Sequence, residues 1–281
     1  MTKTILDIEI THPDKIVFLK SKIRKIDLVN YYKDIYLKMK PYLDNRLLSV
    51  IRYHSEKNQK FFKKHPDNEI VEKFYIKRPK IKENLYFYIS SKKQLINQIQ
   101  LGTIEFHLWG SKVTNINCPD ILVFDLDPDE NISINKLRLA VKTLKNVLDD
   151  LGLKSFLKTS GGKGYHVYVP IKKCSSYKKL EDFSKKVAIL LETKNPSLYV
   201  TTVSKEKRKD KIFIDFLRNK KGATCVCPYS LRIRDTATIS FPISWKDLDV
   251  IKPNEINIKN YKKYLKTNPW SQFFKIEQEL L

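Results

Sequence analysis

The chain has 281 residues, 42% of them hydrophobic, which is enough apolar material for the core of one large or two small domains. It carries 54 lysine and arginine residues against 31 aspartate and glutamate residues, a formal net charge of +23. This excess is larger than solubility requires and favours a polyanionic partner, nucleic acid first, unless an AT-rich genome alone has raised the lysine content.

The cysteines argue against a zinc finger and against a disulfide framework. They form no Cys-x-x-Cys pair and have no histidine at zinc-ligand spacing; they are Cys118, Cys174, Cys225 and Cys227. We therefore expect the protein to work in a reducing cytoplasm. No window reaches the roughly 18 uncharged apolar residues of a membrane span, and the short apolar stretch at the N-terminus contains an acid, so we expect neither a signal peptide nor a membrane helix.

Apolar residues at helical spacing predict three helices. The first covers residues 27–40 and is expected to stop at Pro41. The second has an apolar stripe over residues 137–151, with Gly152 placed as its C-terminal cap. The third covers about residues 177–193.

Apolar or alternating runs between these helices predict the strands. They lie at residues 85–89, 121–126, 155–158, 165–170, 211–217 and 231–233. The two densest charge runs, residues 57–64 and 205–211, are expected to be loops. Strands interleaved with helices in this order predict an α+β or mixed α/β sheet protein.

The most informative segment is residues 121–128, an apolar strand that ends in Asp125, Leu126, Asp127 and Pro128. Side chains at i and i+2 share a face of a strand, so the two carboxylates point together. They repel each other unless a cation lies between them, and a divalent metal ion suits carboxylate oxygens. Pro128 removes a backbone donor and leaves the acids at a strand end that a substrate can reach.

A glycine-rich segment separates two of the predicted strands. Three of the seven glycines fall within residues 161–164, which lets the backbone approach a ligand and direct N–H groups at it. Ser160 and Lys163 add a hydroxyl and a charge, and His166 faces the same side of the next strand as Tyr168. A strand follows rather than a helix, so this is not a Walker motif. The alternative is a hairpin turn with a structural histidine.

Asp215 interrupts the otherwise apolar strand predicted at residues 211–217. Burial of an unpaired carboxylate is costly, so this residue needs a partner. It either forms a structural ion pair with an arginine, Arg218 or Arg232, or is a third ligand of the metal held by Asp125 and Asp127. The nearby Asp-x-Asp strand favours the metal.

Three other uses of the acidic pair fit less well. An EF-hand loop that starts at Asp125 needs glycine at its sixth and glutamate at its twelfth position, where this chain has Glu130 and Lys136. A haloacid-dehalogenase-type phosphatase usually has threonine or valine in place of Asp129 and does not explain the glycine segment. A nucleotide-sugar transferase is a poor match for a net charge of +23.

Taken in order, three segments resemble the motifs of the archaeo-eukaryotic primase superfamily, and most of all the polymerase domain of bacterial DNA ligase D. They are residues 125–128, 159–166 and 215–219, and residues 11–15, 105–110, 228–234 and 244–245 extend the resemblance over nearly the whole chain. The resemblance implies a single catalytic domain over residues 1–281, with a primase-like α+β core whose mixed or antiparallel sheet is flanked by helices. Its parts would be a DNA-end-binding N-terminal lobe (about 1–110), the catalytic core (about 111–250) and a C-terminal tail (251–281) packed on the core.

The same resemblance implies the site residues. Asp125, Asp127 and Asp215 would be catalytic and hold two divalent metal ions, manganese or magnesium. The nucleotide-binding residues would be Ser160, Lys163, His166, Arg232, Arg234, His107 and Arg52. Arg218 and Asn219 would support the site, and the i, i+2 spacing of Arg232 and Arg234 would put two guanidinium groups on one strand face.

Contacts with DNA follow from the resemblance as well. Lys15 and Lys25 would bind the 5′-phosphate of the downstream strand at a gap or break. Phe61 and Phe62, which lie among lysines, would stack on template bases, and only one of the two is expected to face the nucleic acid.

The expected function is a template-directed polymerase of non-homologous end joining that fills DNA ends. It would add ribonucleoside or deoxyribonucleoside triphosphates to a primer 3′-hydroxyl, with ribonucleotides preferred. The expected partners are broken or gapped DNA, the nucleotides, Ku and a separate ligase, because the sequence has no Lys-x-Asp-Gly adenylation motif. The expected location is the cytoplasm, at the nucleoid. The alternatives are a stand-alone primase of a mobile element and an inactive DNA-end-binding scaffold.

Overall fold

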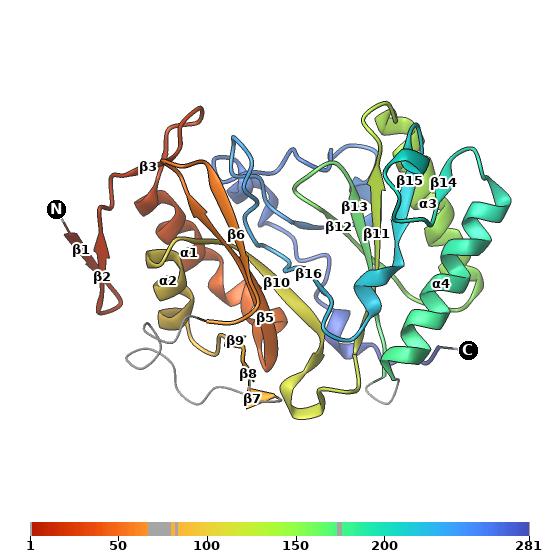
Figure 1. The fold of residues 1–281 in the computed structure, drawn as a ribbon, viewed down its shortest axis with the longest axis horizontal. Coiled ribbons are helices and arrows are strands. Elements are labelled where there is room, and N and C mark those ends of the chain that lie inside the picture. Colours follow the sequence, from red (N-terminus) through yellow and green to blue (C-terminus); the bar gives the residue numbers. More distant parts are fainter. Residues whose placement is uncertain (1, 67–79, 82–83, 173–175, 281) are drawn as a thin grey trace.

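Two β-sheets stand side by side, with helices on their outer sides (Figure 1). The structure is a computed structural model, and it describes residues 2–66, 80–81, 84–172 and 176–280. Cys174 lies outside these residues. Among the described residues, no helix combines the length and apolar character that a membrane span needs.

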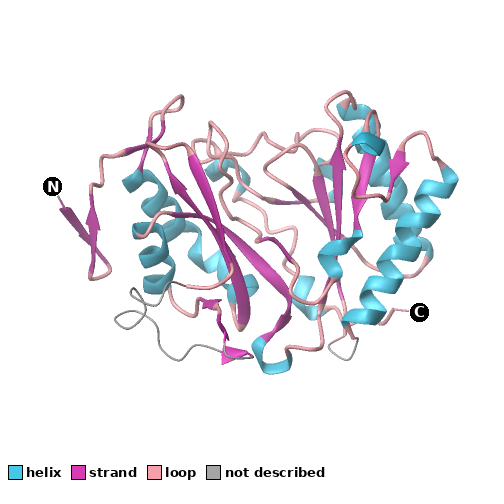
Figure 2. Cartoon of the chain, in the orientation of Figure 1, coloured by secondary structure: helices cyan, strands magenta, loops and turns pink. Residues whose placement is uncertain are grey.

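The first sheet has five strands and carries helices α1 and α2 on one side (Figure 2). Its order is β16 (Thr224–Val226), β10 (Thr103–Lys112), β5 (Arg46–His54) and β6 (Gln59–Lys63), and β9 (Phe87–Tyr88) also pairs with β5. Helix α1 (Lys25–Leu43) buries a stripe of tyrosines and aliphatic residues, and the ring of Tyr32 meets Phe106 of β10 at 5.3 Å. Helix α2 (Lys92–Gln100) begins at Ser91, whose side chain accepts a hydrogen bond from the Gln94 N–H.

The second sheet has six strands and lies against helices α3 and α4. Its order is β14 (Tyr199–Val200), β15 (Ile212–Asp215), β11 (Ile121–Pro128), β13 (Tyr165–Pro170), β12 (Phe156–Thr159) and β17 (Pro242–Ile243). All neighbouring strands are antiparallel except β14 and β15, which are parallel. Helices α3 (Ile134–Asp150) and α4 (Tyr177–Lys194) both begin at a capping serine. Strand β11 is therefore central, with a neighbour on each side.

Short elements complete the chain. They are the hairpins β1 (Thr2–Ile5) with β2 (Ile8–Thr11), β3 (Ile16–Phe18) with β4 (Ile23–Arg24), and β7 (Lys80–Ile81) with β8 (Asn84–Leu85). The segment that follows residue 251 buries Trp270 and Phe273, whose rings stack at 4.9 Å. Both rings also pack near Phe156 of β12, so this segment closes one end of the core.

Most of the predicted elements are confirmed, with shifted ends. The helix predicted at residues 27–40 is α1, but Pro41 lies inside it and the helix continues to Leu43. The other two helices match α3 and α4, and Gly152 follows α3 with φ +70°. Residues 211–217 divide into β15 and a 3₁₀ turn, Phe216–Asn219, and residues 85–89 divide into parts of β8 and β9.

Two sequence-based assignments were wrong, and several elements were missed. The charge run at residues 57–64 is not a loop, because β6 runs through it as the edge strand of the first sheet. Residues 231–233 form no strand; Leu231 makes an isolated bridge to Ile239 within a turn. Helix α2 and strands β5 and β10 were not predicted. Helix α2 buries polar residues such as Gln94 and Gln98, and this obscures its apolar periodicity.

The glycine-rich segment is the turn that joins β12 to β13, and Gly164 is its tightest point. A Cβ atom at Gly164 would lie 1.9 Å from the carbonyl oxygen of Leu126 on β11. A side chain of any size is therefore incompatible with the approach of this turn to the central strand.

We predict that Gly164→Ala strongly destabilises the fold, by about 3 kcal/mol or more. The new Cβ would clash with the backbone carbonyl of Leu126, which cannot move aside as a flexible side chain could. Denaturant unfolding of the purified variant measures this. Gly162→Ala in the same turn is the matched control, since its Cβ would meet only side-chain atoms, the Ser160 hydroxyl at 3.3 Å and the Arg234 guanidinium at 3.5 Å. Equal stability of the two variants would contradict the prediction.

Candidate active site

Strand register brings the three predicted aspartates onto one face of the second sheet. Asp125 of β11 is directly opposite Asp215 of β15, and Asp127 follows two residues after Asp125. On the other side, Asp125 is directly opposite His166 of β13. Residues opposite each other in antiparallel strands share a face, so all four side chains lie together. Asn219 fixes this arrangement, because its side chain bonds both the N–H and the carbonyl of Val123 on β11.

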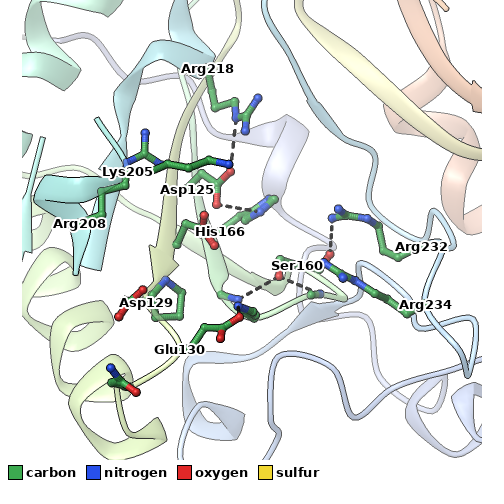
Figure 3. A pocket seen from close by; sticks show the side chains of 16 residues that line it. Asp125, Asp129, Glu130, Ser160, His166, Lys205, Arg208, Arg218, Arg232 and Arg234 are labelled. Carbon is green, nitrogen blue, oxygen red and sulfur yellow. Dashed lines mark hydrogen bonds and ion pairs between the residues drawn. The ribbon is translucent and has the colours of Figure 1, made fainter. Parts of the chain in front are cut away.

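The carboxylate of Asp125 lies between two cationic partners. Its Oδ1 is 3.2 Å from His166 Nε2 and its Oδ2 is 3.3 Å from Arg218 Nε (Figure 3). Burial alone would raise the pKa of Asp125, but these two neighbours hold it well below its ordinary value. Burial alone would lower the pKa of His166, and the Asp125 carboxylate raises it instead. Asp125 is thus an ionised, compensated carboxylate.

The other two carboxylates are less well compensated. Burial and the charge of Asp125 raise the pKa of Asp127. Burial also raises the pKa of Asp215, although Arg218 Nε lies 3.0 Å from its Oδ2 and opposes the shift. The structural ion pair considered for Asp215 is therefore formed with Arg218. The site still carries excess negative charge at its floor.

A cleft of about 770 Å³ opens in front of these acids. Its lining includes seven of the predicted metal- and nucleotide-binding residues, namely Asp125, Asp127, Ser160, Lys163, His166, Arg232 and Arg234, and the predicted supporting residue Arg218. Asp215 lines an adjoining cavity of about 380 Å³ that shares Asp125 and Asp127 with the cleft. The structure therefore brings the acids, the glycine turn and the arginine pair to one place.

The glycine turn supplies Ser160 and Lys163 to the cleft, but the N–H groups of its three glycines are bonded within the protein. The hydroxyl oxygen of Ser160 accepts hydrogen bonds from the N–H groups of Gly162 (3.0 Å) and Gly164 (3.2 Å). Gly161 donates its N–H to the carbonyl of Pro253. The expectation that these N–H groups point at a ligand was wrong, because they stabilise the turn itself. Lys163 pairs with exposed Glu130 at 2.7 Å, at the edge of the cleft.

Arg232 and Arg234 reach the cleft from a turn rather than from a strand face. The N–H of Arg234 bonds the carbonyl of Arg232 at 2.9 Å, and the N–H of Ala237 bonds the carbonyl of Arg234 at 2.8 Å. Arg232 also donates from its guanidinium NH1 to the carbonyl oxygen of Ser160 at 2.8 Å. The turn and the glycine segment are therefore linked across the cleft.

Two further predicted pocket residues lie outside the lining of both cavities. His107 on β10 contacts Glu105 at 3.0 Å and is connected to the cleft through that carboxylate. Arg52 on β5 places its guanidinium carbon 6.0 Å from the ring centre of Phe87, in the first sheet. His107 thus neighbours the cleft, whereas the guanidinium group of Arg52 lies near Phe87 of the first sheet.

The residues predicted to contact DNA lie on the N-terminal half of the chain. The N–H of Lys25 bonds the carbonyl of Lys15 at 2.9 Å, so the two lysines are neighbours. Burial and the charge of Lys15 lower the pKa of Lys25. Phe61 and Phe62 on β6 are 45% and 51% exposed. Adjacent residues of a strand face opposite sides, so the two rings cannot serve one surface.

Sequence reasoning missed two cations and one acid. Lys205 and Arg208 line the cleft from the charge run at residues 205–211 (Figure 3). Arg208 lies 3.5 Å above the ring of Phe213, which is opposite Asp127 in the strand register. This run lies only a few residues before Asp215 in the sequence, and that closeness could have indicated that its cations reach the site. Glu105 lies two residues before His107 and received no role.

The donor set suits a divalent metal in its chemistry. The three carboxylates share one face, and carboxylate oxygens are the ligands that magnesium and manganese prefer. Within the described residues, no group of three or more His, Cys, Asp and Glu side chains is arranged as a metal site. Two of the three carboxylates are paired with Arg218 instead, whose Nε lies 3.3 Å from Oδ2 of Asp125 and 3.0 Å from Oδ2 of Asp215.

A family model of the LigD primase-polymerase domain matches residues 24–270. The chain belongs to this family. It is 29% identical to the multifunctional non-homologous end joining protein LigD of Pseudomonas aeruginosa over 284 residues, which cover 97% of this chain and 34% of that protein. It is 31% identical to the bifunctional non-homologous end joining protein LigD of Bacillus subtilis, over 86% of this chain and 39% of that protein. The chain thus spans little more than a third of these relatives.

A solved structure has the same fold. The polymerase domain of Mycobacterium tuberculosis ligase D, in complex with DNA, superimposes with a TM-score of 0.85 at 24% sequence identity, over 95% of this chain and 98% of that one. The expected family, the α+β fold of the LigD polymerase domain and the enzyme class, a nucleotidyltransferase, are therefore confirmed.

We predict that two similar substitutions at the acids change stability in opposite directions in chelator-treated protein. Asp127→Asn should raise the melting temperature by about 1–2 °C, because it removes a charge that the folded state disfavours; the effect is small because the residue is exposed. Asp125→Asn should cost about 3 kcal/mol, because it removes a paired carboxylate that is only 14% exposed.

The pH dependence follows from the two shifts. A raised folded-state pKa makes ionised Asp127 destabilising above its ordinary pKa, so the gain should vanish in acid. A lowered folded-state pKa makes Asp125 stabilising above its ordinary pKa, and this contribution is lost only as the pH falls through the lowered pKa, so most of the cost of Asp125→Asn should remain at pH 3.5. Thermal unfolding at pH 7 and pH 3.5 measures both, and Asp149→Asn, at an exposed residue of α3, is the control. A lower melting temperature for Asp127→Asn at pH 7 would contradict the prediction.

Proposed function

We propose that this chain is a template-directed polymerase that fills DNA ends in non-homologous end joining. The observation that carries the proposal is the set of three carboxylates on one sheet face, which line a cleft and the cavity that adjoins it, beside walls that hold cations. The names of the LigD relatives support the pathway, and the DNA in the similar M. tuberculosis structure supports the substrate.

Asp125, Asp127 and Asp215 would hold two divalent metal ions. When bound, such ions activate a primer 3′-hydroxyl and neutralise charge on a triphosphate. The chain itself supplies orientation: His166 and Arg218 hold Asp125 from two sides, and Asn219 fixes the backbone of β11. Metal binding adds cations where the pKa values of Asp127 and Asp215 are raised, and so relieves their repulsion.

The walls of the cleft suit a triphosphate. Arg232 and Arg234 enter from one side and Lys205 and Arg208 from the other (Figure 3). Guanidinium groups bind phosphate oxygens in pairs of hydrogen bonds and keep their charge at any physiological pH. Ser160 and Lys163, from the glycine turn, would complete the contacts. We propose that ribonucleotides are preferred, as the family resemblance implies.

The two neighbouring lysines suit the 5′-phosphate of a downstream DNA strand. Lys15 is 38% exposed and pairs with Glu56 at 2.8 Å, and the ammonium group of Lys25 bonds the carbonyl of Thr11. A phosphate between the two ammonium groups would relieve the repulsion that lowers the pKa of Lys25. Phe62 or Phe61 would stack on a template base. Ku and a separate ligase are the further partners that we propose, with the nucleoid as the location.

We predict that Asp127→Ala abolishes nucleotide addition, with a loss of about a thousandfold or more, but retains DNA binding, because the charge that binds DNA lies elsewhere. The assay is extension of a gapped duplex with manganese and either ribonucleoside or deoxyribonucleoside triphosphates. If the unsubstituted chain adds no nucleotide, the proposal fails and the inactive DNA-end-binding scaffold is the remaining alternative. If it adds nucleotides on unprimed single-stranded DNA, the primase alternative is favoured.

We predict that Lys15→Ala with Lys25→Ala removes the stimulation of extension by a downstream 5′-phosphate, about tenfold, and leaves extension without that phosphate unchanged. The assay compares gapped duplexes with and without the 5′-phosphate. Lys33→Ala with Lys38→Ala on α1 is the control, since it removes the same charge elsewhere. An equal loss in the two double variants would show a general charge effect and contradict a specific site.

A further inference from the structure

Glu105 on β10 is a buried carboxylate behind the cleft, and its side chain is 5% exposed. Its Oε2 lies 3.0 Å from Nε2 of His107 and 2.9 Å from Nε of Arg232. Its Oε1 accepts a hydrogen bond from the N–H of Ile233 at 2.8 Å. One carboxylate thus contacts a histidine, an arginine and the backbone of the turn that carries both cleft arginines.

The contacts of Arg232 show what this carboxylate constrains. The guanidinium NH1 donates to the carbonyl of Ser160, on the glycine turn, while Nε pairs with Glu105 on the first sheet. The group is held from two elements and lines the cleft between them. Without Glu105 one of these anchors is lost, and a flexible arginine side chain regains rotamers that point away from the cleft.

The contact with His107 fixes the state of its ring. An ionised carboxylate can only accept hydrogen bonds, so Nε2 of His107 must carry the proton. Burial lowers the pKa of His107, and the ring is neutral. Its Nδ1 is therefore an acceptor. The ring of half-exposed Phe62 meets this histidine edge-on at 6.1 Å, which places the imidazole between the cleft and the proposed template surface.

We propose that Glu105 is a positioning residue for the incoming nucleotide: it directs Arg232 toward the triphosphate and sets the tautomer of His107, without contacting the substrate itself. This inference rests on the proposed function. It assigns a role to an acid directly behind a cleft that would bind an anion, where a negative charge would otherwise oppose binding.

The sign of the effect separates positioning from plain electrostatics. Glu105→Gln keeps the shape of the side chain and can still accept from Ile233, but it removes a negative charge. If only net charge mattered, a more positive cleft would bind the triphosphate more tightly and the KM would fall. If Glu105 positions Arg232 and His107, the KM should rise, because an amide N–H in place of a carboxylate oxygen repels their N–H groups.

The experiment measures the KM for ATP with manganese on a saturating gapped duplex, together with the dissociation constant of manganese ATP by calorimetry. We expect Glu105→Gln to raise both by about tenfold, with kcat changed by less than about threefold. An unchanged or lower KM and dissociation constant would overturn the inference. If the unsubstituted chain does not extend DNA, the proposed function fails, and the calorimetric constant still decides whether Glu105 governs nucleotide binding.

Two further variants exclude a general loss of structure. Asp120→Asn breaks another buried carboxylate–arginine pair, that of Asp120 with Arg46, away from the cleft; it should lower the melting temperature and leave the KM unchanged. Arg232→Lys keeps the positive charge but removes the guanidinium group with its several N–H donors. In that background Glu105→Gln should raise the KM by about threefold or less, because both changes remove the same anchor. Full additivity, or an equal rise in KM for Asp120→Asn, would contradict positioning through Arg232.

Discussion

Repulsion between three carboxylates on one face of a sheet is the constraint on which the rest of this structure depends. Strand β11 lies between β13 and β15, and the register sets Asp125 directly between His166 and Asp215. Three acids so close would oppose folding if they were not compensated. Arg218, one 3₁₀ turn after Asp215, lies within 3.3 Å of both Asp125 and Asp215 and provides the compensation. Arg218 is therefore the residue that compensates two of the three acids. We expect metal ions to compete with it for these carboxylates.

The local features of the site could be read from the sequence because they depend on neighbouring residues alone. Asp125 and Asp127 share a face by the two-residue period of a strand, and the apolar run before them predicts a buried central strand. Register between distant strands has no such signal. That Asp215 is opposite Asp125, or that Glu105 contacts Arg232, 127 positions later, depends on tertiary packing. These pairings required the structure.

For the glycine turn, the predicted location was correct but the predicted reason for its glycines was wrong. Three glycines close together were expected to free N–H groups for a ligand. In the structure the N–H groups of Gly162 and Gly164 bond the hydroxyl of Ser160, and Gly164 is glycine because the carbonyl of Leu126 leaves no room for a Cβ. The turn lines the cleft as expected, but its composition is set by packing against β11. Sequence composition alone does not separate these two demands on glycine.

Burial of the acid partner divides the cations of the proposed substrate surface into two kinds. Lys163 pairs with Glu130 and Lys15 with Glu56, and these acids are 82% and 71% exposed. Exposed pairs contribute little stability, so a phosphate can replace the acid at little cost. Arg232 pairs with Glu105, which is 5% exposed. A buried acid cannot leave its partner without losing compensation of its own charge. We infer that the lysines exchange partners when a substrate binds, whereas Arg232 keeps its acid and binds phosphate with the rest of its guanidinium group.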